Sequence, residues 1–478
     1  MSTESNFPIE FPTWLSSQRW YAGKGAVPRV ERIGGWQIDH DGVRIVTHYI
    51  LDHLAERTAL YQVPLTERSE ALVGIEPIGT RTAPDSSTVF VYDATVDSAY
   101  AEALLNLMLT EDSVGNNRQT SGSDPADTAA GSTAPLAQNA VVGHRQPGAP
   151  AVTVLSASRL TGEQSNTSII CQVAEGNPVI IKVFRALHHG ENPDVTLQSA
   201  IAAAGSLRVP TSLGYLSGAW SDTGRADGRA VGHLAFAQEF LPGVQDAWRV
   251  ALRAAETNED FSEPARALGE ATAEVHAILA SVLPVREASD ADVTDVLFSM
   301  TSRMSLALSE LPQLEEFRSQ IERIYDAARG TSWPALQRVH GDFHLGQVLL
   351  VPERGWVLLD FEGEPLRPMA ERSQLDLTLR DIAGMLRSFD YAAGSVSLSG
   401  GDKAAAAHWA SSAREAFLAG YVATSGMDLG RFESLLEALE LDKALYEAVY
   451  EARNRPDWVE IPALAIQRLA ARDVAPTV

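Results

Sequence analysis

Residues 339–350 read VHGDFHLGQVLL, and residues 355–365 read GWVLLDFEGEP. In each stretch an apolar run with strand character leads into an aspartate, Asp342 in the first and Asp360 in the second. We therefore expect both carboxylates where a buried strand ends and a loop begins. Gln347 follows Asp342 by five residues and adds an amide oxygen. This set suits phosphoryl transfer from a magnesium nucleotide: one aspartate accepts the proton of the attacking hydroxyl, and the other carboxylate and the amide hold the metal.

Size and charge narrow the class of protein. At 478 residues the chain predicts two or three domains, and its 45% apolar residues suffice for globular packing. The net charge of −24 argues against nucleic-acid binding and against an anionic membrane surface, because both need basic patches. The only cysteine, Cys171, excludes an internal disulfide and predicts a reducing compartment. With neither a signal-peptide pattern nor an apolar run near twenty residues, we expect a cytoplasmic protein.

Composition divides the chain into four parts. Residues 1–112 show period-two alternation, which predicts a small β-rich domain closed by a helix over 99–108. Residues 113–150 are rich in Gly, Ser, Thr and Ala and predict a flexible linker or loop. Residues 151–245 return to strand patterns, and 246–478 are mainly helical, with helices predicted over 262–279, 293–306, 314–328, 380–391 and 441–453.

The HGD-x-H string with Asp360 resembles the catalytic and metal-binding loops of the aminoglycoside phosphotransferase-like kinases. The fuller strings resemble the narrower group of bacterial maltokinases, as does WLSSQRWYAGK at residues 14–24, which is similar to their N-terminal cap domain. This resemblance implies an α+β, bilobal protein-kinase-like fold, with the N-lobe at 151–245, the C-lobe at 246–478 and the cap at 1–112. It implies that His344 supports the loop and that Glu362 is a further metal or sugar contact. Gln347 stands where the family pattern has Asn.

The N-lobe pattern contains a lysine inside an apolar strand. Lys182 lies within the run VIIKVF at residues 179–184, a costly place unless its ammonium reaches an anion or, on an edge strand, water. The resemblance implies that this anion is the phosphate chain of the nucleotide. The family pattern also expects an acidic partner on the next helix, and maltokinases carry a glutamate where Thr196 stands. The partner here must be Asp194, Glu191, or absent.

Two further segments are expected to contact the nucleotide. The polar turn at 162–168 lies between two predicted strands and, by the resemblance, covers the phosphates with Ser165 and Thr167. The run LAFAQEFLPG at 234–243 matches the hinge of the fold, which places Gln238, Glu239 and Phe240 beside the adenine. A solvated carboxylate at the strand end is an equal alternative for Glu239.

The last strong helical pattern carries a stripe of three residues, Lys443, Tyr446 and Tyr450, at positions i, i+3 and i+7. Tyrosines in such a stripe suit sugar recognition, although packing against the lobe is the plainer alternative. The resemblance to the saccharide-binding helix of maltokinases favours sugar contact, and Glu447 lies on the same helix. Earlier in the C-lobe, Asp381 and Arg387 are expected to brace the catalytic loop, and His276 to be a core histidine.

The resemblance implies an ATP- and Mg²⁺-dependent sugar kinase, with maltose converted to maltose 1-phosphate as the leading reaction. It also suggests a functional link to a trehalose-to-maltose isomerase. The alternative is a glucosamine kinase that forms glucosamine 6-phosphate, for which Asp376, Glu447 or Glu451 could supply a free carboxylate to the amine. A third alternative is a catalytically silent kinase-fold binding protein. The expected partner is a small saccharide, with neither nucleic acid nor membrane.

Overall fold

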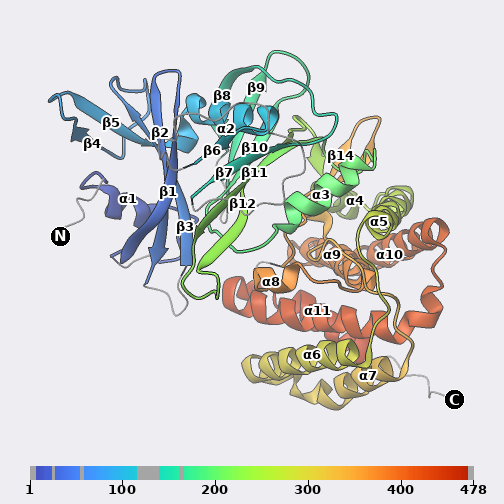
Figure 1. Ribbon diagram of the computed structural model, residues 1–478. Coiled ribbons are helices and arrows are strands. Elements are labelled where there is room, and N and C mark those ends of the chain that lie inside the picture. Colours follow the sequence, from blue (N-terminus) through green and yellow to red (C-terminus); the bar gives the residue numbers. More distant parts are fainter. Residues whose placement is uncertain are drawn as a thin grey trace. The chain divides into compact units, whose positions relative to one another are not determined.

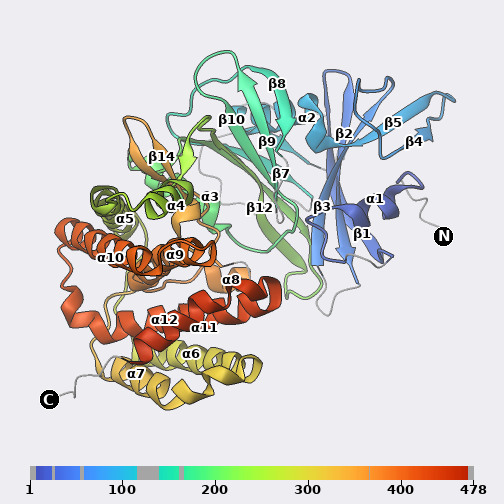
Figure 2. The same ribbon diagram turned by 180° about the vertical axis from the view of Figure 1, so that it is seen from behind.

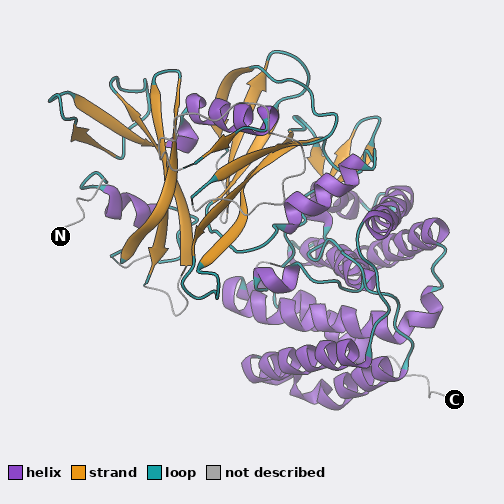
Figure 3. Cartoon of the chain, viewed as in Figure 1, coloured by secondary structure: helices purple, strands orange, loops and turns teal. Residues whose placement is uncertain are grey.

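A computed structural model describes residues 7–23, 27–53, 59–115, 139–160, 166–364 and 367–471 of the chain. The chain divides into two compact units. Unit 1 comprises Met1–Val195 and Pro210–Pro242, and unit 2 comprises Thr196–Val209 and Gly243–Val478. Strands are concentrated in unit 1, whereas unit 2 is mostly helical (Figure 3), as the sequence predicts.

Unit 1 contains two antiparallel sheets (Figure 1). The first has the strand order β1-β2-β3-β5-β4, and the second has the order β6-β7-β11-β12-β10-β9-β8. The strands of the first are β1 (Val30–His40), β2 (Val43–Asp52), β3 (Ala59–Arg68), β4 (Gly79–Thr82) and β5 (Thr88–Asp93). Those of the second are β6 (Ser113–Val114), β7 (Val141–Arg145), β8 (Val154–Arg159), β9 (Asn166–Val173), β10 (Val179–Phe184), β11 (Ser212–Ser221) and β12 (Arg229–Glu239).

The helices of unit 1 are α1 (Phe11–Ser17) and α2 (Ser98–Thr110), with a 3₁₀ turn η1 (Ala94–Val96), and α3 (Pro193–Ala203) begins at its boundary. The predicted helix over 99–108 is confirmed as α2. This helix packs on β7 and β11, and it crosses β7 at Gly143, where an added Cβ would lie 1.8 Å from the carbonyl oxygen of Leu107. Only glycine permits so close an approach.

The predicted cap and N-lobe share one core within unit 1. Side chains of both sheets and of α2 pack together there, including Trp36, Tyr49, Leu104, Cys171 and Leu216. Gln62 of β3 donates two hydrogen bonds to carbonyl oxygens beyond its own sheet, those of Phe184 and Leu234. The cap is therefore built into the same unit as the strands of the N-lobe.

The linker predicted over 113–150 needs correction at its ends. Its first residues form β6 and pair with β7, which lies near its C-terminal end and pairs with β11. Composition missed β7 because only five residues, VVGHR, interrupt the Gly- and Ala-rich context, and the sheet neighbours that stabilise them are remote in sequence. Residues 116–138 of this segment lie outside the described part of the chain.

Unit 2 combines a bundle of helices with a small three-stranded sheet, β13-β14-β15 (Figures 1 and 2). All predicted C-lobe helices are confirmed. The elements are β13 (Gln245–Asp246), α4 (Ala247–Thr257), α5 (Ser262–Val282), α6 (Asp290–Glu310), η2 (Pro312–Phe317), α7 (Arg318–Gly330), η3 (Leu345–Gln347), β14 (Val348–Val351), β15 (Gly355–Leu358), α8 (Met369–Arg372), α9 (Thr378–Leu398), α10 (Lys403–Ser425), η4 (Leu429–Phe432), α11 (Glu433–Asn454), η5 (Pro456–Trp458) and α12 (Glu460–Ala470).

The core of unit 2 is formed by the faces of α5, α9, α10 and α11 that carry alanine, leucine and aromatic side chains. Phe389 of α9 packs there against Phe261, Trp409 and Phe417. Among the described residues, we find no helix with the length and apolar character needed to cross a lipid bilayer.

Candidate active site

The loop 339–347 is anchored from beneath by a buried carboxylate. Asp381 of α9 is 1% exposed and accepts hydrogen bonds from the backbone N–H groups of His340, at 2.8 Å, and Gly341, at 2.9 Å. His276 lies 3.0 Å from the same carboxylate and 2.9 Å from the hydroxyl of Tyr421. Burial raises the pKa of Asp381, but the hydrogen bond and charge of His276 outweigh it, so the net shift is downward. The predicted brace at Asp381 and the predicted core histidine are both confirmed.

With His340 and Gly341 held by Asp381, Asp342 lies at the tip of the loop. The residue before it, Gly341, has a left-handed backbone, with φ 83°. The Asp342 side chain is 20% exposed. His344 accepts a hydrogen bond from the N–H of Gly346 and so closes the turn that leads into β14, which agrees with the supporting role expected of it. Burial lowers the pKa of His344, and the charge of Asp342 opposes this shift without outweighing it. The lowered pKa favours the neutral imidazole, which is the form that can accept the hydrogen bond from Gly346.

The structure brings the two predicted metal-binding loops together. β14 and β15 pair in antiparallel register, with Val348 opposite Leu358, so Gln347 and Asp360 lie side by side where these strands meet their loops. The amide nitrogen of Gln347 lies 3.1 Å from the carboxylate of Asp360. Asp360 holds a left-handed backbone, φ 61°, a costly conformation for a residue other than glycine that often marks functional sites. A carboxylate and an amide oxygen are ligands that suit Mg²⁺.

A lysine of α11 reaches the proposed proton acceptor. Lys443 Nζ lies 3.2 Å from Asp342 Oδ1 and 2.7 Å from Glu364 Oε1. Burial lowers the pKa of Lys443, but Glu364, Asp342 and Glu447 outweigh it and raise the pKa above its usual range. Burial raises the pKa of Glu364, but Lys443 and Arg367 outweigh it and lower the pKa to about 2. This bridge therefore stays charged on both sides near neutral pH.

A small cavity lies against this bridge, and its lining is dominated by charged and aromatic side chains. It is lined by Arg303, Gly341, Asp342, Phe343, Glu364, Arg380, Gly384, Leu439, Asp442, Lys443 and Tyr446. Tyr446 places its ring under the Lys443 ammonium, 5.1 Å from it. Two of the three predicted stripe residues, Lys443 and Tyr446, thus line the same cavity as Asp342.

The other two residues predicted on this helix lie elsewhere. Tyr450 is 42% exposed, and its ring packs under Arg455 rather than in the cavity. Glu447 accepts a hydrogen bond from the fully buried Arg387 at 2.9 Å, so its expected role as a sugar contact needs correction. Arg387 likewise does not brace the catalytic loop, because its guanidinium spans Glu447 and Asp390.

In unit 1, Lys182 occupies the position the sequence predicts. β10 pairs with β9 on one side and β12 on the other, so the alternative of an edge strand is excluded. Lys182 Nζ lies 2.6 Å from Asp194 Oδ2, with the lysine side chain 13% exposed and the aspartate fully buried. Asp194 lies in the first turn of α3, which decides between the partners that the sequence left open.

Strand register corrects the prediction that Thr167 contacts the nucleotide. Lys182 lies opposite Ser168, whereas Thr167 lies opposite Val183 and so points to the other face of the sheet. There its hydroxyl accepts a hydrogen bond from Arg185, a buried arginine that also binds Asp93. Thr167 is therefore part of the packing between the two sheets. Ser165 lies outside the described residues.

The predicted hinge shows a similar division. Gln238 lies opposite Ile180, two residues from Lys182 along β10, and so shares the face of Lys182. Glu239 points to the opposite face, and its carboxylate accepts hydrogen bonds from Asn177 and Thr211. Its expected contact with base or ribose is not supported. The N–H of Phe240 donates to the carbonyl oxygen of Pro178.

Sequence reasoning missed two charged residues near Asp342. Glu364, 5% exposed, is the second partner of Lys443, and its signal was the repeated acidic pattern DFEGE that follows β15. Arg372 lies near a group of carboxylates, those of Glu362, Asp342, Asp360 and Glu364. Burial lowers the pKa of Arg372 in spite of these charges. Arg372 lies in α8, where no sequence motif indicates that it faces these carboxylates.

This fold and these loops are those of a phosphotransferase with the protein-kinase fold. The model of the phosphotransferase enzyme family matches residues 156–432, more than half of the chain, so the chain belongs to that family. The maltokinase N-terminal cap domain matches residues 14–97. The resemblance to maltokinase-like kinases and the predicted α+β, kinase-like fold with its cap are thereby confirmed.

Two relatives of this chain are glucosamine kinases. The glucosamine kinase of Streptacidiphilus jiangxiensis is 29% identical in an alignment of 346 residues. This alignment covers 66% of this chain and 74% of that protein. The glucosamine kinase of Mycolicibacterium smegmatis (strain ATCC 700084 / mc(2)155) is 28% identical over 326 residues, 65% of this chain and 78% of that protein. A solved structure of a glucosamine kinase in complex with glucosamine, ADP and inorganic phosphate shares the fold, with a TM-score of 0.66 and 22% sequence identity. The superposition covers 96% of this chain and 99% of that chain.

Proposed function

We propose that this protein transfers the γ-phosphate of ATP to a hydroxyl group of a small amino sugar, with glucosamine as the leading acceptor. The observation that carries the proposal is the bridge from Asp342 through Lys443 to Glu364. It places a solvent-reachable carboxylate and a second, buried carboxylate on one small charged cavity. Both relatives named above are glucosamine kinases, so maltose, the leading acceptor from sequence, becomes the second candidate, supported by the match of the maltokinase cap.

In this proposal the residues of the chain divide the work of phosphoryl transfer. Asp342 accepts the proton of the attacking hydroxyl, and Lys443 fixes the direction of its carboxylate. Asp360 and Gln347, with Glu362 close by, would hold Mg²⁺, which neutralises charge on the phosphates. Lys182, oriented by Asp194, binds the α- and β-phosphates.

The acceptor is tested with purified protein, ATP and Mg²⁺, by following ADP release and the mass of the sugar product. We expect turnover of glucosamine and little of maltose, and N-acetylglucosamine tests whether the amine is needed. Asp342→Asn should lower kcat at least a hundredfold while ADP binding is retained. Preference for maltose would replace the leading acceptor by the second candidate. Wild-type turnover by Asp342→Asn would remove Asp342 from its role.

A further inference from the structure

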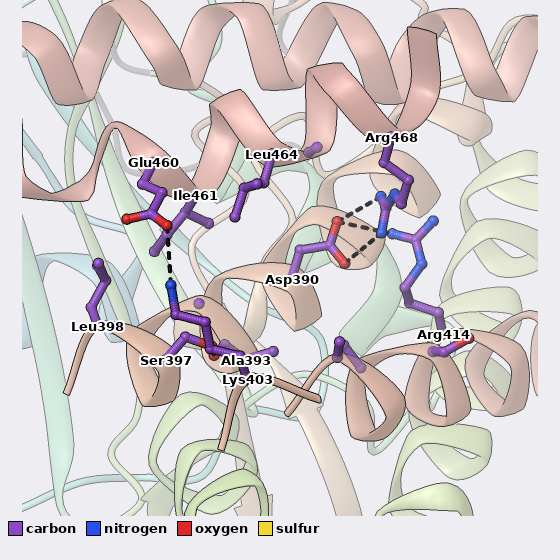
Figure 4. A pocket seen from close by; sticks show the side chains of 15 residues that line it. Asp390, Ala393, Ser397, Leu398, Lys403, Arg414, Glu460, Ile461, Leu464 and Arg468 are labelled. Atoms are coloured by element: carbon purple, nitrogen blue, oxygen red, sulfur yellow. Dashed lines mark hydrogen bonds and ion pairs between the residues drawn. The ribbon is translucent and has the colours of Figure 1, made fainter. Parts of the chain in front are cut away.

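Three helices of unit 2, α9, α10 and α12, form a cavity that is separate from the Asp342 site (Figure 4). Its volume is about 430 Å³, within the usual range of about 300–1,000 Å³ for small-molecule sites. Small side chains leave the space, among them Ala393, Gly394, Ala407, Ala410 and Ala465. The cavity is thus a feature of how these helices pack.

The cavity carries charged side chains at both ends and apolar side chains between them (Figure 4). Leu398, Ile461 and Leu464 supply apolar wall, and Leu464 remains 55% exposed although it is a large hydrophobic residue. Leu398, also in the lining, is 40% exposed, so two large hydrophobic side chains are open to solvent beside the hollow. The cavity therefore has room and affinity for a hydrocarbon body.

In the lining itself cationic side chains outnumber anionic ones, whereas the whole chain is acidic. Three cationic side chains line the cavity, Lys403, Arg414 and Arg468, against two anionic ones, Asp390 and Glu460. The chain as a whole carries a net charge of −24. Lys403 is 71% exposed and Arg468 38% exposed, so both reach the open part of the site. Such local cations select an anionic group.

The base of the cavity is a network of ion pairs (Figure 4). Asp390 accepts hydrogen bonds from Arg468, at 2.8 and 3.2 Å, and from Arg414, at 3.4 Å. At the rim, Lys403 lies 3.4 Å from Glu460. The Nε–H of Arg468 is buried and has no acceptor among the described residues, so this guanidinium has a donor to offer when the side chain turns.

The same network continues to α11. Arg414 and Arg468 also bind Glu440, and the buried Arg387 joins Asp390, at 2.6 Å, to Glu447. Glu440 and Glu447 flank Lys443 on one face of α11, at i−3 and i+4. Lys443 in turn contacts Asp342. A change in the pairing of Arg468 therefore reaches the helix that positions Asp342.

We propose that the cavity between α9, α10 and α12 binds an amphipathic anion, a hydrocarbon chain ending in a carboxylate or a phosphate, and that this binding alters the acceptor site through α11. The hydrocarbon lies against Ile461 and Leu464, and the anionic end pairs with Arg468, at the end of the cavity where Asp390 lies. The effect on the acceptor site rests on the proposed function, whereas the binding of the anion does not.

Binding is tested on the full chain by calorimetry and thermal unfolding with four eight-carbon probes below their micelle concentrations. These are octanoate, octyl phosphate, octylamine and 1-octanol. We expect at least one anion to bind and to raise Tm, and to bind at least tenfold more tightly than octylamine and octanol. Comparison of octanoate with octyl phosphate identifies the preferred head group. Equal or weaker binding of both anions than of octylamine would overturn the proposal.

Variants on α10 locate the site. Ala407→Trp fills the mouth of the cavity from an exposed position and should abolish anion binding, whereas Ala404→Trp, also exposed on α10 but outside the lining, should leave it unchanged. On α12, Arg468→Gln should weaken binding at least tenfold. Binding that survives Ala407→Trp at the wild-type Kd would place the anion elsewhere and overturn the inference.

Coupling is measured as the acceptor KM with and without a saturating anion. We expect a shift of at least threefold in the wild type and none in Ala407→Trp. Anion binding without such a shift would refute the coupling. If the protein turns over no sugar, the proposed function fails while the binding result stands by itself, so the two failures are distinguishable.

Discussion

The ion pair between Lys182 and Asp194 gives a quantitative test of the nucleotide site. Its atoms lie 2.6 Å apart, with the lysine 13% exposed and the aspartate fully buried. Removing one partner of such a buried pair typically costs about 3–5 kcal/mol. Asp194→Asn keeps a hydrogen-bond acceptor but loses the charge, so we take the lower value, about 3 kcal/mol. If Lys182 loses as much of its interaction with the phosphates in the transition state, kcat/KM for ATP falls about a hundredfold.

The assay is a double-mutant cycle on kcat/KM for ATP at a fixed acceptor concentration. Lys182→Met removes the cation itself and should lower kcat/KM at least as much as Asp194→Asn does. If Asp194 acts by orienting Lys182, Asp194→Asn should cost less than about threefold further in the Lys182→Met background. Glu191→Gln is the matched control, because Glu191 was the other acidic candidate before α3, and it should change kcat/KM less than twofold.

Two results would refute this reasoning. A hundredfold loss from Asp194→Asn in both backgrounds would mean that Asp194 acts independently of Lys182. A large loss from Glu191→Gln would move the partner to that residue. Thermal unfolding of each variant separates these outcomes from a loss of fold, since a variant that is still folded at the assay temperature and has a reduced kcat/KM has lost function at the site.

Three further predictions concern stability and are measured by denaturant or thermal unfolding. Asp381→Asn should destabilise unit 2 by about 3 kcal/mol, because it removes a buried charge that accepts two backbone N–H groups and a histidine; an effect below 1 kcal/mol would contradict this. Glu364, with its pKa lowered from 4.5 to about 2, contributes stability above pH 4.5 that is lost as the pH falls towards 2, by about 3 kcal/mol, and Glu364→Gln should remove this pH dependence. Gly143→Ala should cost about 2 kcal/mol or more, because its Cβ would meet the backbone of α2, whereas Gly115→Ala, with open space around it, should be nearly neutral.

The two aspartate loops and the strand lysine were predictable because each is a local pattern. The strand expected before Asp360 is confirmed as β15, and Lys182 lies in β10, but the strand expected before Asp342 was wrong, because only isolated bridges at Leu336 and Gln337 precede that loop. The choice of Asp194 as partner was not predictable, because it depends on how α3 packs on β10. Thr167 shows the same limit: adjacent residues of a strand point to opposite faces, and only the register of β9 against β10 shows which face carries Lys182.

Helical spacing misled for a related reason. Lys443 and Glu447 lie on the same helix, α11, and both were expected to contact the sugar. In the structure Lys443 turns to Asp342, and Glu447 turns to Arg387 of α9, a partner sixty residues away in the chain. Periodicity identifies the face of a helix, but the charges supplied by neighbouring helices decide which ligand each side chain on that face receives.

This pairing has a consequence for the choice of acceptor. The three carboxylates proposed from sequence to receive an amine are all engaged: Asp376 by Arg380, Glu447 by Arg387, and Glu451 by Arg455. An ammonium group of a sugar must therefore exchange with a cation already bound to the protein. At the Asp342 cavity that cation is Lys443, whose ammonium lies on Glu364 and Asp342 at once. Since Lys443 serves two carboxylates, an arriving amine that takes one of them would leave the lysine paired through the other. If the acceptor is an amino sugar, its ammonium would therefore share these carboxylates with Lys443, and the new ion pair would have to offset both the desolvation of the amine and the contact that Lys443 gives up. Maltose brings no charge to exchange, and it would have to bind without disturbing the bridge.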